Sequence, residues 1–218
     1  FGYNLTTQKD VNNFLESGNI SYLIISGEDI TDLSALKFAS IGSLIIRNTN
    51  VLDLSLPNLT SVQEELRIEG NSKLIKISDL SKLKEINGEL VINNNVLLTD
   101  ISGLLDVQGG AGTISVINNK ALGEDYSYGL FPLRYLYEKG KFDGIFRIAD
   151  NHPKAATDIE DIGKLEDGIS SYTIASRKDA LEFAPTNTTV RNLTISGSEI
   201  TDEVLRLLTG KVKKIIGT

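Results

Sequence analysis

The chain repeats a short phrase in which apolar and polar residues alternate and asparagine follows. Examples are SLIIRNTN, ELRIEGN, ELVINNN, ISVINN and IFRIADN. Because successive side chains of a β-strand point to opposite faces, each phrase predicts a short strand with one apolar pair facing inward. The predicted inward pairs are Leu23/Ile25, Leu44/Ile46, Leu66/Ile68, Leu90/Ile92, Ser115/Ile117 and Phe146/Ile148.

The spacing of these pairs predicts a repeat architecture. Their first residues are 21, 22, 24, 25 and 31 positions apart. A period of this size is typical of a solenoid, in which each coil adds one strand and neighbouring coils stack in parallel. One coil cannot bury its apolar face, whereas a stack of coils forms a continuous core. We therefore predict an α/β repeat fold, a right-handed single-stranded β-solenoid of about six coils.

Asparagine follows five of the six predicted strands, where the chain must turn out of the sheet. Its backbone tolerates the left-handed region, and its amide can bond backbone groups of the turn. We expect these side chains to stack into a structural ladder from coil to coil. The candidates are Asn48 or Asn50, Asn71, Asn94 or Asn95, Asn119 and Asn151.

Two further features recur in each coil. A second apolar phrase, such as LIKISDLSKLKEI, follows the turn and is expected to face the same core from the far walls. Glycine stands just before several strands, where we expect a tight corner. These glycines are Gly42, Gly88, Gly112 and Gly144.

Residues 56–104 read LPNLTSVQEELRIEGNSKLIKISDLSKLKEINGELVINNNVLLTDISGL. This stretch resembles the receptor L-domain branch of leucine-rich repeat proteins, a module of the insulin and epidermal growth factor receptors that also occurs in fungal cell-wall proteins and in surface proteins of gut-dwelling Bacteroidetes. The shared pattern is I-x-G-x-L-x-I-x-x-N with a following L-x-x-I/L, and it extends loosely over residues 19–152. The resemblance implies a leucine-rich-repeat solenoid with a binding role. Because the receptors carry disulfides and this chain has no cysteine, the bacterial cell-surface type fits better.

An amphipathic segment, TTQKDVNNFLESG, precedes the first coil and predicts a short helix that caps the open end of the core. Its expected cap is Thr6 or Thr7, its apolar face holds Val11, Phe14 and Leu15, and it stops at Gly18.

The opening of the chain recurs near its end. ISYLIISGEDITD at 20–32 and VRNLTISGSEITD at 190–202 are identical at seven of thirteen positions, and SRKDALEFA at 176–184 matches the predicted capping helix. We predict that residues 1–170 form one solenoid domain and that residues 171–218 start a second copy, which is truncated. The alternative is that residues 171–218 form a C-terminal cap of the first solenoid.

An aromatic insert, GEDYSYGLFPLRYLYEKGKFDG, separates the fifth and sixth predicted strands. Residues 132–139 predict a short helix with Leu133, Leu136 and Tyr137 facing inward. This helix could close the far end of the core, or the rings could form a platform for a sugar or a protein. The candidate ligand-binding residues here are Tyr126, Tyr128, Tyr135 and Tyr137.

The outward strand positions form a second candidate binding surface. They combine an apolar stripe with flanking charges, as protein-binding surfaces do. Since β-branched residues favour strands in any case, a purely structural role stays open as well. The predicted outward residues are Ile24, Ile45, Arg67, Val91, Val116 and Arg147.

Charge and composition exclude or disfavour several classes of binding partner. The net charge is −7, the pI is about 4.9 and no basic block occurs, which disfavours nucleic acid and anionic membrane surfaces. No apolar run approaches the ~20 residues of a transmembrane helix. The absence of cysteine excludes disulfides and thiolate chemistry. Because the chain starts at Phe1 and contains no methionine, we expect that a signal or anchor segment has been removed. The resemblance to cell-surface proteins implies that the protein is extracellular or at the cell surface.

The sequence offers little chemistry. Its one histidine, His152, has no recognisable partner, and no nucleophile elbow, phosphate loop or zinc spacing occurs. We therefore expect no metal, no cofactor and no enzymatic activity, but a recognition domain for a protein or glycan. The alternatives are a structural spacer, or a carbohydrate-active β-helix enzyme that would use Asp143 and Asp150. Neither the ligand nor the oligomeric state follows from the sequence.

Overall fold

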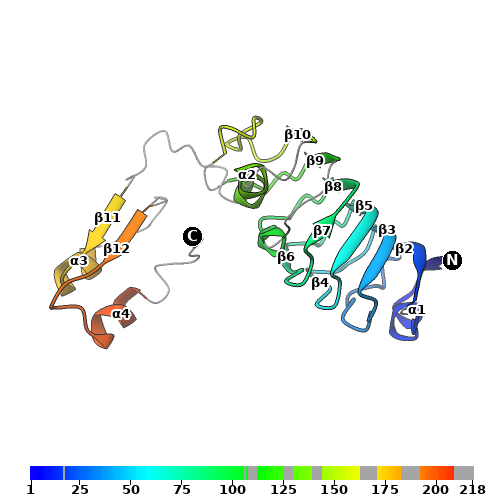
Figure 1. Ribbon diagram of the computed structural model, residues 1–218, viewed down its shortest axis with the longest axis horizontal. Helices are drawn as coiled ribbons and strands as arrows, with labels where there is room; N and C mark the ends of the chain where they lie inside the picture. Colours follow the sequence, from blue (N-terminus) through cyan, green and yellow to red (C-terminus); the bar gives the residue numbers. More distant parts are fainter. Residues whose placement is uncertain are drawn as a thin grey trace. The chain divides into compact units, whose positions relative to one another are not determined.

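A computed structural model describes residues 1–16, 18–105, 107, 112–124, 130–138, 144–162, 171–182 and 192–208. The chain forms two compact units, Phe1–Gly163 and Lys164–Thr218, and each is described by itself (Figure 1).

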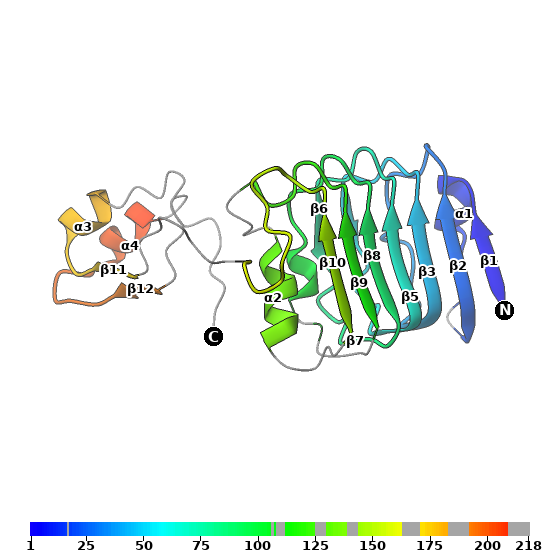
Figure 2. The same cartoon turned by 90° about the horizontal axis from the view of Figure 1, so that it is seen from above.

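The first unit is a β-solenoid of about seven turns built around one parallel sheet. Its strands lie side by side in chain order, all pointing the same way (Figure 2). The order is β1 (Gly2–Leu5), β2 (Ile20–Ser26), β3 (Ser40–Arg47), β5 (Ser61–Glu69), β8 (Glu89–Asn93), β9 (Thr113–Ile117) and β10 (Ile145–Ala149). The short strand β7 (Glu85–Ile86) pairs with β5 beside this path. The predicted parallel solenoid is confirmed, whereas the right hand of its coils stays a prediction.

Strand β1 is an addition that the repeat pattern did not predict. Its Tyr3 and Leu5 pair with Leu23 and Ile25 of β2, so β1 continues the inward-facing pattern at the edge of the sheet. The repeat pattern did not include this strand because no asparagine directly follows it.

Two columns of apolar side chains run across the strands on the inner side of the sheet. Burial of each Leu or Ile side chain contributes ~1.5–3 kcal/mol, so these columns hold the coils together. All members are buried except the partly buried Phe146. The columns are Leu23, Leu44, Leu66, Leu90, Ile114 and Phe146, and Ile25, Ile46, Ile68, Ile92, Val116 and Ile148.

Strand β9 is shifted by one residue from its predicted register. Val116 pairs with Ile92 and Ile148 and is fully buried, and the outward residue of β9 is Ser115. The predictions that Ser115 faces inward and Val116 outward are therefore wrong. The phrase ISVI carries apolar residues on both faces, so alternation alone does not fix the register. The buried Asn119, three residues after Val116, fixes it as in the neighbouring coils.

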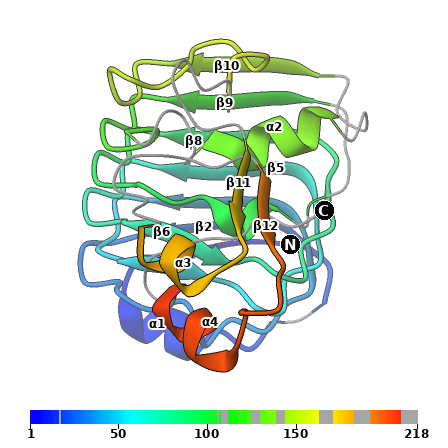
Figure 3. The same ribbon diagram turned by 90° about the vertical axis from the view of Figure 1, so that its left-hand side faces the viewer.

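The far walls of the coils complete the core. Here β4 (Asp53–Ser55) and β6 (Lys76–Asp79) form a small parallel sheet, and η1 (Ser102–Leu104) follows in the next coil. Figure 3 shows the coils of the first unit stacked one upon another. The apolar residues of the predicted second phrases are all buried: Leu33, Leu36, Leu54, Leu59, Ile77, Leu80, Leu83, Ile86, Ile101 and Leu104. Ile86, however, lies in β7 beside the main sheet and not on a far wall.

The glycines before the strands allow neighbouring coils to approach closely. A Cβ atom on Gly88 would lie 1.8 Å from the carbonyl oxygen of Glu64, and one on Gly112 would lie 1.9 Å from that of Gly88. Neither glycine has a left-handed backbone. Glycine is needed at these two positions for space between the coils, a reason that the prediction of a tight corner did not include.

Two adjacent residues form the turn after each of the strands β3, β5, β8, β9 and β10, and they have different roles. The first has a left-handed backbone, with φ between 52° and 66°, and the second is buried. Asparagine and glycine suit the first position because they tolerate positive φ. The left-handed residues are Asn48, Gly70, Asn94, Asn118 and Asp150, and the buried residues are Thr49, Asn71, Asn95, Asn119 and Asn151.

The buried residues form the predicted ladder, with Thr49 as an unpredicted first rung. The backbone N–H of each of the first four rungs donates to the side-chain Oδ1 of the next rung, as from Asn71 to Asn95 and from Asn95 to Asn119 at 3.0 Å. Each Asn Nδ2 also donates to a strand carbonyl of an earlier coil, for example Asn95 to Ile68 at 2.9 Å. We call this set, Thr49, Asn71, Asn95, Asn119 and Asn151, the asparagine ladder.

Helix α1 (Gln8–Asn12) begins as predicted at Thr7. Thr7 Oγ1 accepts a hydrogen bond from the Asp10 N–H at 3.1 Å, and the Asp10 carboxylate accepts from the Thr6 and Thr7 N–H groups at 3.0 and 2.9 Å. The backbone N–H of Thr6, followed by the Thr7 hydroxyl, lowers the pKa of Asp10 below its usual value. This reciprocal arrangement is a capping box, which fixes where the helix starts.

The apolar face of this segment is only partly as predicted. Val11 and Phe14 are buried, and the Phe14 ring meets Tyr3 edge to face at 5.2 Å. Leu15 is 88% exposed, so its predicted inward position is wrong. The role of the helix as a cover for the open end stays a prediction.

Near the other end of the first unit, α2 (Phe131–Glu138) lies in the aromatic insert. Leu133 and Leu136 are buried in the core as predicted, whereas Tyr137 is 36% exposed and does not point fully inward. Ile162 is buried in the same core and Ile159 packs against it.

The second unit repeats the element order of the first unit's opening. It contains β11 (Ser171–Ile174), α3 (Arg177–Glu182), β12 (Asn192–Ile195) and α4 (Asp202–Leu208), with β11 parallel to β12. The Asp179 carboxylate accepts from the Ala175 and Ser176 N–H groups at 2.9 Å each, and the Asp179 N–H donates to Ser176 Oγ at 3.2 Å. These are the same bonds that Asp10 makes in the first unit.

Candidate recognition surface

The outer face of the main sheet brings most of the predicted strand residues into one line. Register places them in a middle column that consists of Ile24, Ile45, Arg67, Val91, Ser115 and Arg147. Val116 is missing from this column because it is buried on the inner side, and Ser115 takes its place. We call these six residues the middle column.

The members of the middle column differ in how far a partner could reach them. Ile24, Ile45 and Arg67 are half-buried, and Arg147 is exposed. Val91 is only 5% exposed, so a partner could hardly contact it, and its role is to pack within the sheet. The accessible apolar members of the middle column therefore lie on β2 and β3.

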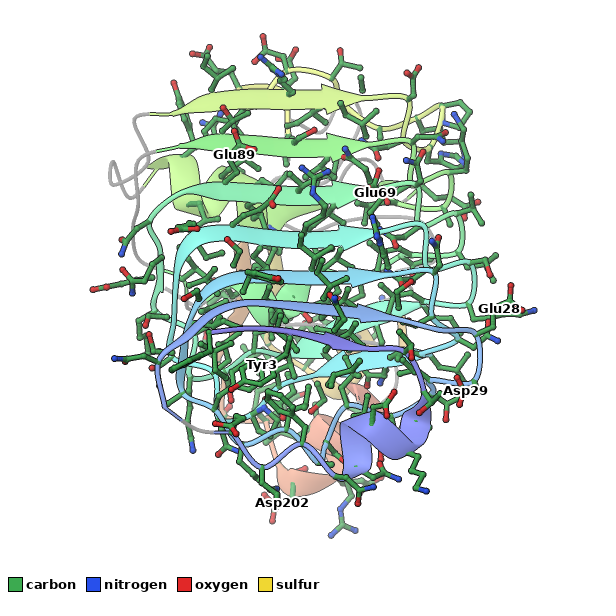
Figure 4. All side chains as sticks on the ribbon, turned by 90° about the vertical axis from the view of Figure 1, so that its right-hand side faces the viewer. Tyr3, Glu28, Asp29, Glu69, Glu89 and Asp202 are labelled. Carbon is green, nitrogen blue, oxygen red and sulfur yellow. The ribbon has the colours of Figure 1, made fainter. Side chains whose placement is uncertain are left out.

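Flanking columns add polar and charged groups at both ends of the strands. Glu65 and Glu89 pair near the amino ends, and Arg47 and Glu69 pair near the carboxyl ends. Figure 4 shows Glu89 and Glu69 at opposite ends of the strands. The apolar middle column thus has a charged rim.

Arg67 is held in place by two carboxylates. Its Nε donates to Glu65 Oε1 at 2.8 Å, and its Nη1 lies 3.3 Å from Glu69 Oε2. Burial lowers the pKa of Arg67, but the hydrogen bonds and charges of Glu65 and then Glu69 outweigh it and raise this pKa above its usual value. The guanidinium therefore stays charged, and the three side chains form a fixed cluster in the middle of the face.

Tyr22 extends the apolar part of the face at the β1 side. Its side chain is 45% exposed, and its ring lies over Gly2, where a Cβ atom would come within 2.1 Å of Tyr22 Cε1. Tyr22, Ile24 and Ile45 lie on the neighbouring strands β2 and β3. We call these three residues the apolar patch. Tyr22 was not among the predicted residues, although its outward position follows from Leu23 being inward.

The predicted aromatic platform is described only at Tyr137. Its ring meets Phe146 edge to face at 5.9 Å, the Arg134 guanidinium lies 5.6 Å from its centre, and its hydroxyl donates to Glu160 Oε1 at 3.3 Å. These contacts tie Tyr137 to the rest of the first unit.

The other three aromatic candidates are not placed. Tyr126 and Tyr128 lie outside the described residues, and so does the side chain of Tyr135, whose backbone belongs to α2. The predicted grouping of these rings therefore stays a prediction.

The described part of the chain shows little that would support a metal site or a catalytic site. No group of three or more His, Cys, Asp or Glu residues there could hold a metal ion. His152 Nδ1 accepts a hydrogen bond from the Lys154 N–H at 3.2 Å. Asp143, one of the two carboxylates of the enzyme alternative, lies outside the described residues, and Asp150 is exposed.

The helices within the described residues are all too short or too polar to cross a bilayer. Fold and surface together define the first unit as a parallel β-solenoid with an asparagine ladder and one broad open sheet face. No protein-family model, curated protein or solved structure matches the chain.

Proposed function

We propose that this chain is a non-enzymatic recognition module of the receptor L-domain branch of leucine-rich repeat proteins, secreted or held at the cell surface, that binds a protein or glycan through the outer sheet face. The observation that carries the proposal is the apolar patch of Tyr22, Ile24 and Ile45 beside the charge cluster around Arg67. Accessible apolar groups with a charged rim are the usual make-up of a binding surface.

The shape of this surface favours a protein over a glycan. Small ligands are usually held in concave sites, whereas protein partners bind broad faces with an apolar centre. The sheet is rigid because its strands are joined by a continuous core and by the asparagine ladder. A rigid face loses little conformational entropy on binding, which raises the affinity.

The family proposal rests on the repeat itself. One parallel strand per coil, leucines on the far walls and a buried asparagine after the strand all agree with the leucine-rich-repeat phrase of residues 56–104. The proposed location at the cell surface rests on the resemblance alone.

A binding screen of the full chain tests the proposal. Extracellular-matrix proteins and a glycan array serve as probes, and Ile45→Glu serves as the disabling variant because a carboxylate in the apolar patch must be desolvated by any partner. The matched control is Leu52→Glu, which changes a 56% exposed apolar residue outside the sheet. We expect saturable binding that Ile45→Glu weakens by about tenfold or more and Leu52→Glu leaves unchanged.

Other outcomes assign the function elsewhere. Binding lost in Tyr137→Ala but kept in Ile45→Glu would move the site to the aromatic insert. No saturable binding to any probe would favour the structural spacer. Turnover of a polysaccharide that is lost in the double variant Asp143→Ala/Asp150→Ala would establish the enzyme alternative.

The second unit is included in this proposal as the start of another copy of the same module. The capping box of Asp179 and the parallel pair β11–β12 support it, because both recur at the opening of the first unit. Expression of residues 1–163 alone tests it. The fragment should unfold at the same urea midpoint as the first unit does within the full chain. A large loss of stability would instead favour the C-terminal cap.

A further inference from the structure

The asparagine ladder ends at Asn151, where hydrogen-bond donors find no acceptor among the described residues. In the preceding coil, the Asn118 N–H donates to the Ala149 carbonyl at 3.0 Å and the Asn119 N–H donates to Asn151 Oδ1 at 3.1 Å. The equivalent N–H groups of Asp150 and Asn151 have no acceptor among the residues that the structure describes. Two adjacent donors are thus left at the end of the stack.

The side chain of Asn151 adds a third donor. Asn119 Nδ2 makes two hydrogen bonds, to the Ile92 carbonyl and to Asn151 Oδ1. Asn151 Nδ2 donates to the Val116 carbonyl at 2.8 Å, and its second hydrogen finds no acceptor in the described part of the chain. Asn151 is only 7% exposed, so an unmet donor is costly at this place.

A hollow of about 310 Å³ lies next to these groups. It is lined by Asp150 and Asn151, by Lys120 of the preceding coil and by the residues of the loop 152–157 other than Lys154. The loop is held by the His152 N–H, which donates to the Leu122 carbonyl at 3.0 Å, and Lys120 Nζ is held by the Asp150 carbonyl at 2.9 Å.

We propose that this hollow binds a carboxylate, whose two oxygens take the places that the Ala149 carbonyl and the Asn151 Oδ1 occupy one coil earlier. A planar group with two acceptor oxygens matches two adjacent N–H donors, and successive N–H groups next to a left-handed residue form an anion-binding concavity. Asp150 supplies the left-handed residue, with φ 54°. Lys120 adds a positive charge, which favours a carboxylate over a neutral amide.

The charges around the hollow provide matched variants. Lys120→Gln removes the cation. Asp150→Asn removes the carboxylate side chain that would repel the ligand, and it suits the left-handed backbone because Asn118 holds the same place one coil earlier. Lys154→Gln is the control, since it removes an exposed lysine of the same loop that does not line the hollow. None of these residues belongs to the outer sheet face, so this site can fail or succeed independently of the proposed function.

Titration of the ¹⁵N-labelled full chain with acetate tests the proposal, with sodium chloride at equal ionic strength as the reference. We expect saturable downfield shifts of the Asp150 and Asn151 amide signals and no shift of Asn119, whose amide already has an acceptor. Lys120→Gln should weaken acetate binding by about tenfold, Asp150→Asn should strengthen it several-fold, and Lys154→Gln should leave it unchanged.

Two further arms identify the natural source of the carboxylate. Glucuronate represents an acidic sugar, and N-acetylglycine represents the carboxyl end of a peptide. The compound that binds with the higher affinity indicates which of these two sources the site recognises. Equal shifts with sodium chloride, or no saturation, would overturn the proposal. Shifts of the two amides on raising the protein concentration alone would also overturn it, because a segment of another chain would then fill the vacant place.

Discussion

Replacement of Asn95 by alanine probes the asparagine ladder at its centre. Asn95 is fully buried, its Oδ1 accepts from the Asn71 N–H at 3.0 Å and from Asn71 Nδ2 at 3.2 Å, and its Nδ2 donates to the Ile68 carbonyl at 2.9 Å. In Asn95→Ala the Asn71 N–H loses its acceptor inside the protein. The Ile68 carbonyl loses one donor.

The expected loss of stability follows from these two groups. An orphaned buried N–H costs ~1–3 kcal/mol, and the lost hydrogen bond to the carbonyl contributes ~0.5–1.5 kcal/mol. We therefore expect Asn95→Ala to lower the free energy of unfolding by about 3 kcal/mol. This is a large share of the ~5–15 kcal/mol that stabilises an ordinary domain.

Urea unfolding followed by circular dichroism measures this loss, with Asn87→Ala as the control. Asn87 is exposed in the same coil, and its Nδ2 donates to Gln63 Oε1 at 2.8 Å, so its loss should cost less than about 1 kcal/mol. Hydrogen exchange of the Asn71 amide should speed up in Asn95→Ala and stay slow in the control. If the two variants unfold within about 0.5 kcal/mol of each other, the ladder contributes far less than its burial implies.

Three more perturbations test the fold and its pH response. For the register of β9, Val116→Lys should cost ~3–5 kcal/mol, since it buries an unpaired charge, while Ser115→Lys should leave the urea midpoint nearly unchanged; the opposite result would restore the predicted register. For the close approach of the coils, Gly88→Ala should lower the melting temperature, because its Cβ would collide with the Glu64 carbonyl, and an unchanged melting temperature would contradict this account. For pH, the lowered pKa of Asp10 means that the capping box stabilises the fold above the ordinary Asp value of 3.8 and that this contribution is lost as the pH falls through the depressed value. Urea midpoints measured downward from about pH 5 should fall less steeply in Asp10→Asn than in the parent chain, and parallel slopes would refute the assignment.

Features that repeat in every coil were predictable from the sequence, and features that depend on a single coil were not. The alternation around Leu66 and Ile68 defines an inward pair without the structure, because the residues beside it are charged. In β9 the alternation is ambiguous, and only the distance from Val116 to Asn119 gives the register. Strand β1 has no such marker at all.

The candidate sites divide in the same way. The middle column follows from the strand period once the register is right, as Ile45 shows. The need for glycine at Gly88 depends on the distance between coils, which the local sequence does not encode. The donors at Asp150 and Asn151, which have no acceptor in the described part of the chain, depend on where the stack of strands ends, and that is visible only in three dimensions.

The regular asparagine ladder also makes the length of the sheet face adjustable. Its inner rungs, Asn71, Asn95 and Asn119, follow one another at intervals of 24 residues. Excision of residues 71–94 would join Gly70 to Asn95, so the left-handed residue would again be followed by an asparagine, and the Thr49 N–H would meet a new but identical amide. Such a deletion shortens the face by one strand spacing of ~4.8 Å and keeps the hydrogen-bond pattern of the ladder. Insertion of a copy lengthens it by the same step, so the reach of this protein can be changed in whole coils while its chemistry is kept.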